Sequence, residues 1–110
     1  MALISKSKIE EATARLVRAY QPEAIYLFGS YAFGEPNEDS DVDFFIILKD
    51  DVKMAWDAFR IGTYAVWAGN IDFPTDILVD KNHSFEHRSI HPSSLEFKIK
   101  QDSITVYRAA

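Results

Sequence analysis

The spacing of apolar residues divides the first half of the chain into one helix and two strands. Ser7 to Glu10 has the spacing of a helix capping box, and apolar residues then recur at helical intervals until Pro22. Ala24 to Phe28 and Val42 to Leu48 are β-prone apolar runs bounded by turn residues, which predicts two strands. The second run is apolar almost throughout, as expected for a strand that is covered on both faces.

The second half of the chain continues this alternation. Asp51 to Ala68 has the apolar period of a long amphipathic helix, and its tryptophans fall on the apolar stripe. Thr75 to Val79 and Ile104 to Tyr107 predict a third and a fourth strand, with short helices between them at His83 to Ile90 and Leu95 to Lys100.

These elements predict a fold of the α/β (α+β) class. We expect a single domain over residues 1–110, in which about four strands form a small mixed sheet. Helices should pack mainly on one face of that sheet, the first helix and the helix over 51–68 among them. Residues 29–40 are rich in Gly, Pro, Asn, Ser and acidic residues, which predicts a loop with about one helical turn.

Composition and charge narrow the class of protein. The 110 residues include 12 Lys and Arg against 17 Asp and Glu, a net charge of −5 that argues against binding free nucleic acid through a basic face. The absence of cysteine excludes disulfides and Cys-ligated metals. Neither a secretory signal nor an apolar run of membrane-spanning length is found, so we expect a cytoplasmic protein without a membrane partner.

Candidate chemistry gathers where the first predicted strand ends and the second begins. The small and acidic residues there are Gly29, Ser30, Gly34, Ser40, Asp41 and Asp43. Residues i and i+2 of a strand point to the same side, so Asp41 and Asp43 should aim two carboxylates at one place. Such a pair favours a hard divalent cation, Mg²⁺ or Mn²⁺. Asp76 begins the third predicted strand and can join the pair if the second and third strands are neighbours.

Other residues have a structural interpretation beside a functional one. His83, His87 and His91 recur at intervals of four and could bind a transition metal, but surface histidines are the better interpretation because Pro92 interrupts the helix. Tyr31 and Phe33 could pack beneath the loop or stack on a base, and the sequence leaves both options open.

The combination of Gly29-Ser30-x-x-x-Gly34, Ser40-Asp41-x-Asp43 and Asp76 resembles the nucleotidyltransferase superfamily of the DNA polymerase β type. In so short a chain it looks like the minimal nucleotidyltransferase (MNT) branch, the antitoxin-like partner of HEPN proteins. The resemblance runs from about Ala24 to Tyr107. Many members carry Arg just before the second glycine, where this chain has Phe33.

The resemblance implies a polymerase β-like fold and a role for each motif residue. It places Gly29, Ser30, Gly34 and Ser40 at the nucleotide, with Ser30 hydrogen-bonded to a terminal phosphate. It gives Asp41 and Asp43 two Mg²⁺ ions, with Mn²⁺ as a substitute, and lets Asp76 share the catalytic ion and favour deprotonation of the acceptor hydroxyl. Two metals together neutralise the entering and leaving oxygens in attack on an α-phosphorus.

The expected activity is therefore transfer of a nucleoside monophosphate, AMP from ATP or its counterpart from another NTP, to a hydroxyl acceptor with release of pyrophosphate. A tyrosine of a HEPN toxin is the acceptor we expect. The alternatives are a non-catalytic antitoxin subunit that neutralises its partner by contact, and an adenylyltransferase of small molecules similar to the aminoglycoside enzymes. The base preference and the oligomeric state, including a homo-oligomer, are left open.

Overall fold

The computed structural model describes residues 3–51 and 73–110. The helix expected over 51–68, with Trp56 and Trp67, lies outside the described residues beyond its first position. The described elements are, in chain order, α1 (Lys6–Tyr20), β1 (Ala24–Phe28), α2 (Ser30–Phe33), β2 (Val42–Leu48), β3 (Thr75–Lys81), α4 (Asn82–Arg88), α5 (Leu95–Asp102) and β4 (Ile104–Arg108). All four predicted strands are confirmed, and β3 continues two residues beyond the predicted end.

Helix α1 begins two residues earlier than the capping-box prediction placed it. Its N-cap is Ser5, whose Oγ accepts a hydrogen bond of 3.3 Å from the backbone N–H of Lys8. Ser7 is therefore inside the helix, and the prediction of a cap at Ser7 was wrong. The helix ends at Tyr20, and its C-cap Gln21 adopts a left-handed backbone conformation (φ 46°) directly before Pro22.

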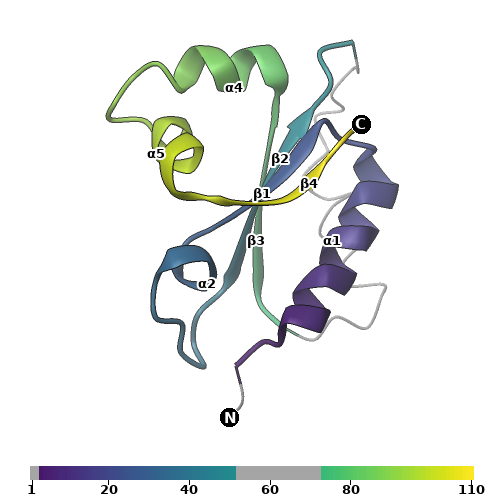
Figure 1. Ribbon diagram of the computed structural model, residues 1–110, viewed down its shortest axis with the longest axis vertical. Coiled ribbons are helices and arrows are strands. Elements are labelled where there is room, and N and C mark those ends of the chain that lie inside the picture. The colour runs from purple at the N-terminus through teal and green to yellow at the C-terminus, as the bar shows by residue number, and fades with distance from the viewer. Residues whose placement is uncertain (1–2, 52–72) are drawn as a thin grey trace.

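The four strands form one mixed sheet in the order β3-β2-β1-β4. Strand β1 pairs antiparallel with both β2 and β4, whereas β2 and β3 are parallel. A parallel pair brings the same ends of its two strands together, so the beginnings of β2 and β3 lie side by side. Figure 1 views this sheet nearly edge-on, with helices on either side of it.

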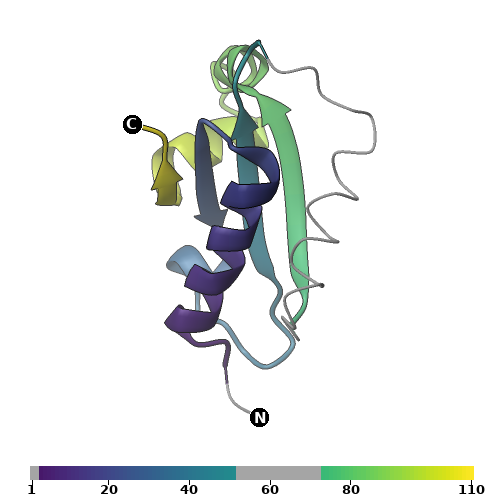
Figure 2. The same ribbon diagram turned by 90° about the vertical axis from the view of Figure 1, so that its right-hand side faces the viewer.

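Alternate residues of β2 enter two different hydrophobic cores. Val42, Phe44 and Ile46 join the core that α1 covers, and Phe45 and Ile47 join the core beneath α4 and α5. Figures 1 and 2 show α1 on one face of the sheet and α2, α4 and α5 on the other. The described helices thus lie mainly on one face, as expected, but α1, which was expected among them, covers the other, because both faces of β2 are apolar and each needs a cover. Among the described helices, none is long and apolar enough to cross a membrane.

The helices α4 and α5 are each fixed by one fully buried side chain. Phe85 of α4 lies edge-on to Phe45 with a centroid distance of 5.4 Å, and Ile99 of α5 is 1% exposed. Burying side chains of this size stabilises a fold by about 1.5–3 kcal/mol each. Since Ile99 anchors α5, its neighbour Lys98 is held near the turn that follows β1.

Candidate active site

Asp43 lies at the centre of the candidate site because its strand, β2, pairs with a strand on each side. Its Cα partner on β1 is Phe28, and its partner on β3 is Asp76. Paired residues of adjacent strands project to the same face of a sheet, so the Asp43 and Asp76 side chains share a face. That face carries α4 and α5, since Phe45 and Leu78, two positions further along their strands, pack in the core there. The condition set for Asp76, that β2 and β3 be neighbours, is met.

Burial and neighbouring negative charges together raise the pKa of the Asp43 carboxyl from 3.8 to about 6. Burial is the largest cause, followed by the negative charges of Asp76 and then Asp41. Asp43 is half-buried, whereas Asp41 and Asp76 are exposed. Asp41 and Asp76 therefore both act electrostatically on the Asp43 carboxyl.

Gly29 is the residue that lets the Asp43 carboxylate reach the end of β1. Its backbone has φ 77°, a conformation that favours glycine. A Cβ at this position would overlap Asp43 Oδ2. The predicted turn glycine is thus required twice, by its backbone angle and by the close approach of the carboxylate.

Gly34 and Ser40 shape the loop between α2 and β2. The Gly34 N–H donates to the Ser30 carbonyl over 3.0 Å, and a Cβ on Gly34 would lie 2.9 Å from Ser30 Cα. Ser40 Oγ accepts a hydrogen bond of 2.9 Å from the Asn37 backbone N–H. The Ser40 hydroxyl therefore holds a turn of the loop, and its placement at the nucleotide stays a prediction.

The two aromatic residues of α2 have different roles. Tyr31 packs against the α1 core, and its hydroxyl accepts a hydrogen bond of 3.1 Å from the Ile4 N–H, so it lies beneath the loop. Phe33 is 49% exposed, and Lys98 of α5 places its Nζ 5.7 Å from the centroid of the Phe33 ring. The sequence analysis did not single out Lys98. Only the return of α5 toward Gly29 reveals it, because nothing in the local sequence connects the two.

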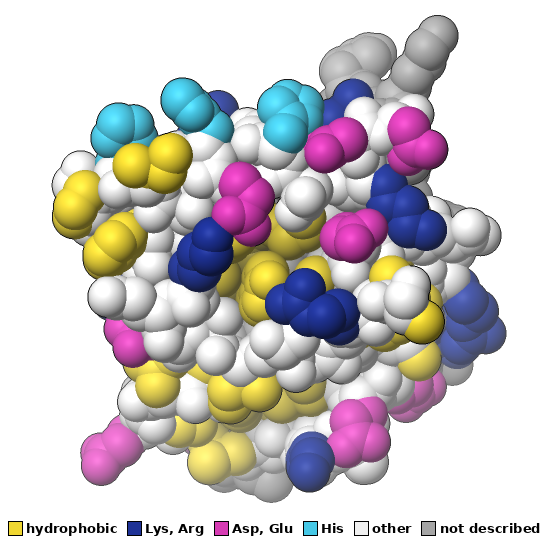
Figure 3. Space-filling model, turned by 45° about the horizontal axis from the view of Figure 1, so that its top comes forward, with side chains coloured by type: hydrophobic (Ala, Val, Ile, Leu, Met, Phe, Trp, Pro, Cys, Tyr) yellow, Lys and Arg dark blue, Asp and Glu magenta, His cyan; other side chains and the backbone are white. Residues whose placement is uncertain are grey.

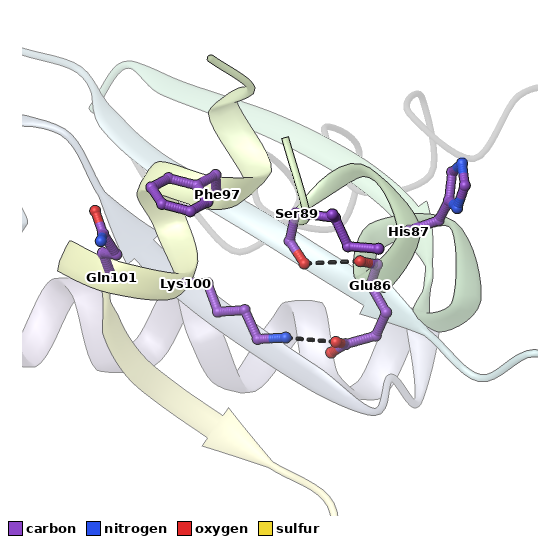
Figure 4. Close-up of a pocket in the computed structure, with 7 residues that line it drawn as sticks. Glu86, His87, Ser89, Phe97, Lys100 and Gln101 are labelled. Atoms are coloured by element: carbon purple, nitrogen blue, oxygen red, sulfur yellow. Dashed lines mark hydrogen bonds and ion pairs between the residues drawn. The ribbon is translucent and has the colours of Figure 1, made fainter. Parts of the chain in front are cut away.

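The larger hollows of the described surface lie away from these carboxylates. One of about 1050 Å³ lies between α1 and β4, on the opposite face of the sheet. Another of about 450 Å³ lies between α4 and α5 and is drawn in Figure 4, where the ion pair of Glu86 and Lys100 (2.5 Å) joins the two helices. A third, of about 100 Å³, is lined by Gly29, Phe33 and Lys98 and adjoins the site.

The three histidines do not form a metal site. All are exposed, and Figure 3 shows them spread along one rim of the molecule. His83 donates its backbone N–H to Asp50 Oδ1 (2.7 Å), and its Nδ1 lies 2.9 Å from the same oxygen, contacts that lower the pKa of Asp50. Helix α4 ends at Arg88, so His91 lies beyond it. The interpretation of surface histidines is confirmed.

A divalent cation fits the chemistry of the acidic face. Carboxylate oxygens are hard donors, and a bound cation would offset both the burial of Asp43 and the repulsion from Asp76 and Asp41 that raise its pKa. Over residues 3–51 and 73–110, however, no three His, Cys, Asp or Glu side chains stand close enough to form a ready-made ion cage. The carboxylates of Asp41, Asp43 and Asp76 are thus chemically suited to a cation, although they are not already arranged around one.

Comparison with known proteins gives this geometry its context. The family model of the nucleotidyltransferase domain matches residues 6–104. The chain belongs to the nucleotidyltransferase family. A relative, the candidate protein adenylyltransferase MJ1379 of Methanocaldococcus jannaschii, is 30% identical over 87 residues, which are 79% of this chain and 79% of the relative. This nucleotidyltransferase is therefore an enzyme of nucleotidyl transfer.

Solved structures share the fold. A candidate nucleotidyltransferase of Sulfolobus solfataricus has a TM-score of 0.57 at 18% identity, covering 93% of this chain and 78% of its own. A chain of a toxin–antitoxin complex with AMP-PNP has a TM-score of 0.60 at 19% identity, covering 91% and 73%. A mutant of the toxin–antitoxin MntA–HpeT in which two aspartates are glutamates has a TM-score of 0.59 at 17% identity and the same coverage. The polymerase β-like fold of the nucleotidyltransferase is thereby confirmed.

Proposed function

We propose that this nucleotidyltransferase transfers AMP from ATP, with Mg²⁺, to a hydroxyl group of a HEPN-family toxin and so acts as an MNT-type antitoxin. The observation that carries the proposal is the placement of Asp43 and Asp76 in register on one face, with Asp41 near enough to act on Asp43 electrostatically. The turn at Gly29 and Ser30 lies directly beneath the Asp43 carboxylate. A protein that only binds a partner has no need of such mutually repelling charges.

The identity of the nucleotide and the acceptor draws on the comparisons. The relative of M. jannaschii is named for adenylyl transfer to protein, and the fold is shared with a toxin–antitoxin chain solved with AMP-PNP. Phe33 and Leu95 are both exposed beside Gly29, at 49% and 40%. Exposed apolar side chains next to a reactive group suit a protein acceptor, whereas the net charge of −5 does not suit a nucleic acid.

Each residue of the site has a distinct part in the transfer. We assign Mg²⁺, replaceable by Mn²⁺, to Asp41, Asp43 and Asp76, where it would neutralise charge on the phosphate oxygens. Gly29 leaves its backbone open to the triphosphate, and the Ser30 hydroxyl donates to an oxygen of the terminal phosphate. Asp76 accepts the proton of the acceptor hydroxyl. The oxygen of that hydroxyl bonds to the α-phosphorus, the bond to the bridging oxygen breaks, and pyrophosphate leaves.

Mass spectrometry of a HEPN-family partner incubated with the enzyme, ATP and Mg²⁺ tests this function. We expect the partner to gain the mass of one adenylyl group on a tyrosine, and we expect Asp41→Asn and Asp43→Asn to abolish the gain. Asp39→Asn is a matched control, because Asp39 is an exposed acid of the same loop. A tight complex without added mass, equally tight in both site variants, would instead show an antitoxin that acts by contact alone.

A further inference from the structure

We propose that Lys98 of α5 binds the phosphate chain of the nucleotide, as a cation that lines the pocket at the Gly29 turn. This inference rests on the proposed function and adds a residue that the sequence motif does not contain. It also concerns affinity for the triphosphate, which can be measured without any acceptor.

The fold brings Lys98 to the turn although it is far away in sequence. Helix α5 starts at a Ser94 cap, whose Oγ accepts from the Phe97 N–H over 3.0 Å, and Ile99 buries the helix against the sheet. Lys98, next to Ile99, lines the 100 Å³ pocket that Gly29 and Phe33 also line. Gly29 is thus shared by the Asp43 carboxylate and by the pocket at whose edge Lys98 lies.

The residues around the Gly29 turn supply no positive charge of their own, so the Lys98 ammonium can supply it. No Lys or Arg occurs in the sequence between Arg18 and Lys49, so the turn, its loop and β2 contain only acidic charges. A triphosphate of about −4 charge that approaches three carboxylates is repelled unless cations are present. Within the described part of the chain, Lys98 is the basic residue that lines the pocket next to Gly29.

The ammonium group of Lys98 is also available for a ligand. Two positions along the same helix, Lys100 is paired with Glu86 at 2.5 Å. Lys98 has no such carboxylate among the described residues, and its Nζ lies over the exposed ring of Phe33 instead. A cation on an aromatic face keeps its N–H donors free on the other side, so Lys98 can contact a phosphate oxygen without first breaking an ion pair.

The size of the pocket beside Lys98 argues against a base-binding site there. Ligand pockets that enclose a drug-sized molecule are about 300–1,000 Å³, and this one is about 100 Å³. It is too small for a nucleobase, and its lining is apolar apart from Lys98, so a phosphate would bind the ammonium at the edge of the pocket and not inside it.

Calorimetric titration of Mg-ATP into the full chain tests the proposal. One lost charge-assisted hydrogen bond weakens binding about tenfold or more. We expect that effect for Lys98→Ala and for Lys98→Met, which keeps an apolar stem on Phe33. Lys98→Arg should stay within about threefold of wild type, and Lys100→Ala should match wild type. Competition by inorganic tripolyphosphate should weaken in the same two variants, whereas competition by adenosine should not change.

The outcomes separate this inference from the proposed function. If wild type binds Mg-ATP and both Lys98→Ala and Lys98→Met bind it within twofold of wild type, the role of Lys98 is refuted and the proposed function stands. If wild type does not bind Mg-ATP, both fall together. Thermal melting of each variant without nucleotide confirms folding, which the exposed Lys98 side chain should not affect.

Discussion

Replacing Asp43 by Asn should stabilise the protein at neutral pH in the absence of metal. The carboxyl has a pKa of about 6 in the folded protein against 3.8 ordinarily, so the folded state holds its proton more tightly than the unfolded state does. Stability is therefore lost as the pH rises from about 4 to about 6, and the loss is complete above that range. One pKa unit corresponds to about 1.4 kcal/mol, which gives an upper limit of about 3 kcal/mol. Asp43 is partly exposed, and screening by solvent reduces this to about 1–2 kcal/mol.

Thermal and urea denaturation in EDTA, from pH 4 to pH 8, measures this effect. A gain of 1–2 kcal/mol raises the melting temperature of a domain this size by about 5–10 °C. The gain of Asp43→Asn should be present at pH 7.5 and fall to a small fraction near pH 4, because the folded carboxyl is then protonated and the unfolded one, with a pKa of 3.8, is about half protonated. Asp39→Asn changes the net charge equally but lies in the exposed loop, so it should have little effect at either pH. A gain that is the same at pH 4 and pH 7.5, or a loss at pH 7.5, would refute the electrostatic reasoning.

Two further predictions concern the site itself. Mg²⁺ with ATP should raise the melting temperature of the wild-type protein, whereas ATP with EDTA should not. Asp43→Asn should lose most of this rise in melting temperature. Equal rises in wild type and in Asp43→Asn would exclude Asp43 as a metal ligand. Gly29→Ala should lower the free energy of unfolding, measured by urea denaturation, by about 1–3 kcal/mol, because the residue has φ 77° and its Cβ would overlap the Asp43 carboxylate. The double variant Gly29→Ala with Asp43→Ala should recover part of this loss, because the overlapping carboxylate is then removed.

The sequence predicts the strands better than the ends of the helices, for a physical reason. Phe44 to Leu48 is an uninterrupted apolar run between acidic residues, and few other structures bury such a run. The start of α1 is different, because Ser5 and Ser7 both offer a capping oxygen and the local pattern does not rank them. The distribution of helices over the two faces also depends on tertiary packing, which the local pattern does not contain.

Some residues of the candidate site could likewise be predicted from the sequence, whereas others are revealed only by the tertiary structure. Gly29 and Asp43 could be found from the sequence, because the turn and the strand that hold them are consecutive along the chain. The position of Asp76 depended on β3 pairing with β2, which the sequence stated only as a condition. Lys98 had no signal at all, since its relation to Gly29 arises from the burial of Ile99 and the return of α5.

The parallel pairing of β2 and β3 determines which chemistry this sheet can perform. In β2, odd-numbered residues face α4 and α5 and even-numbered ones face α1, so Asp43 and Phe44 point to opposite sides. A shift of β3 by one residue would place Ile77 beside Asp43 and turn Asp76 toward the α1 core, where its charge would be buried. Burial of Ile77 on the α1 side therefore fixes the register that brings the two carboxylates together. The hydrophobic core thus holds in place a pair of charges that repel each other.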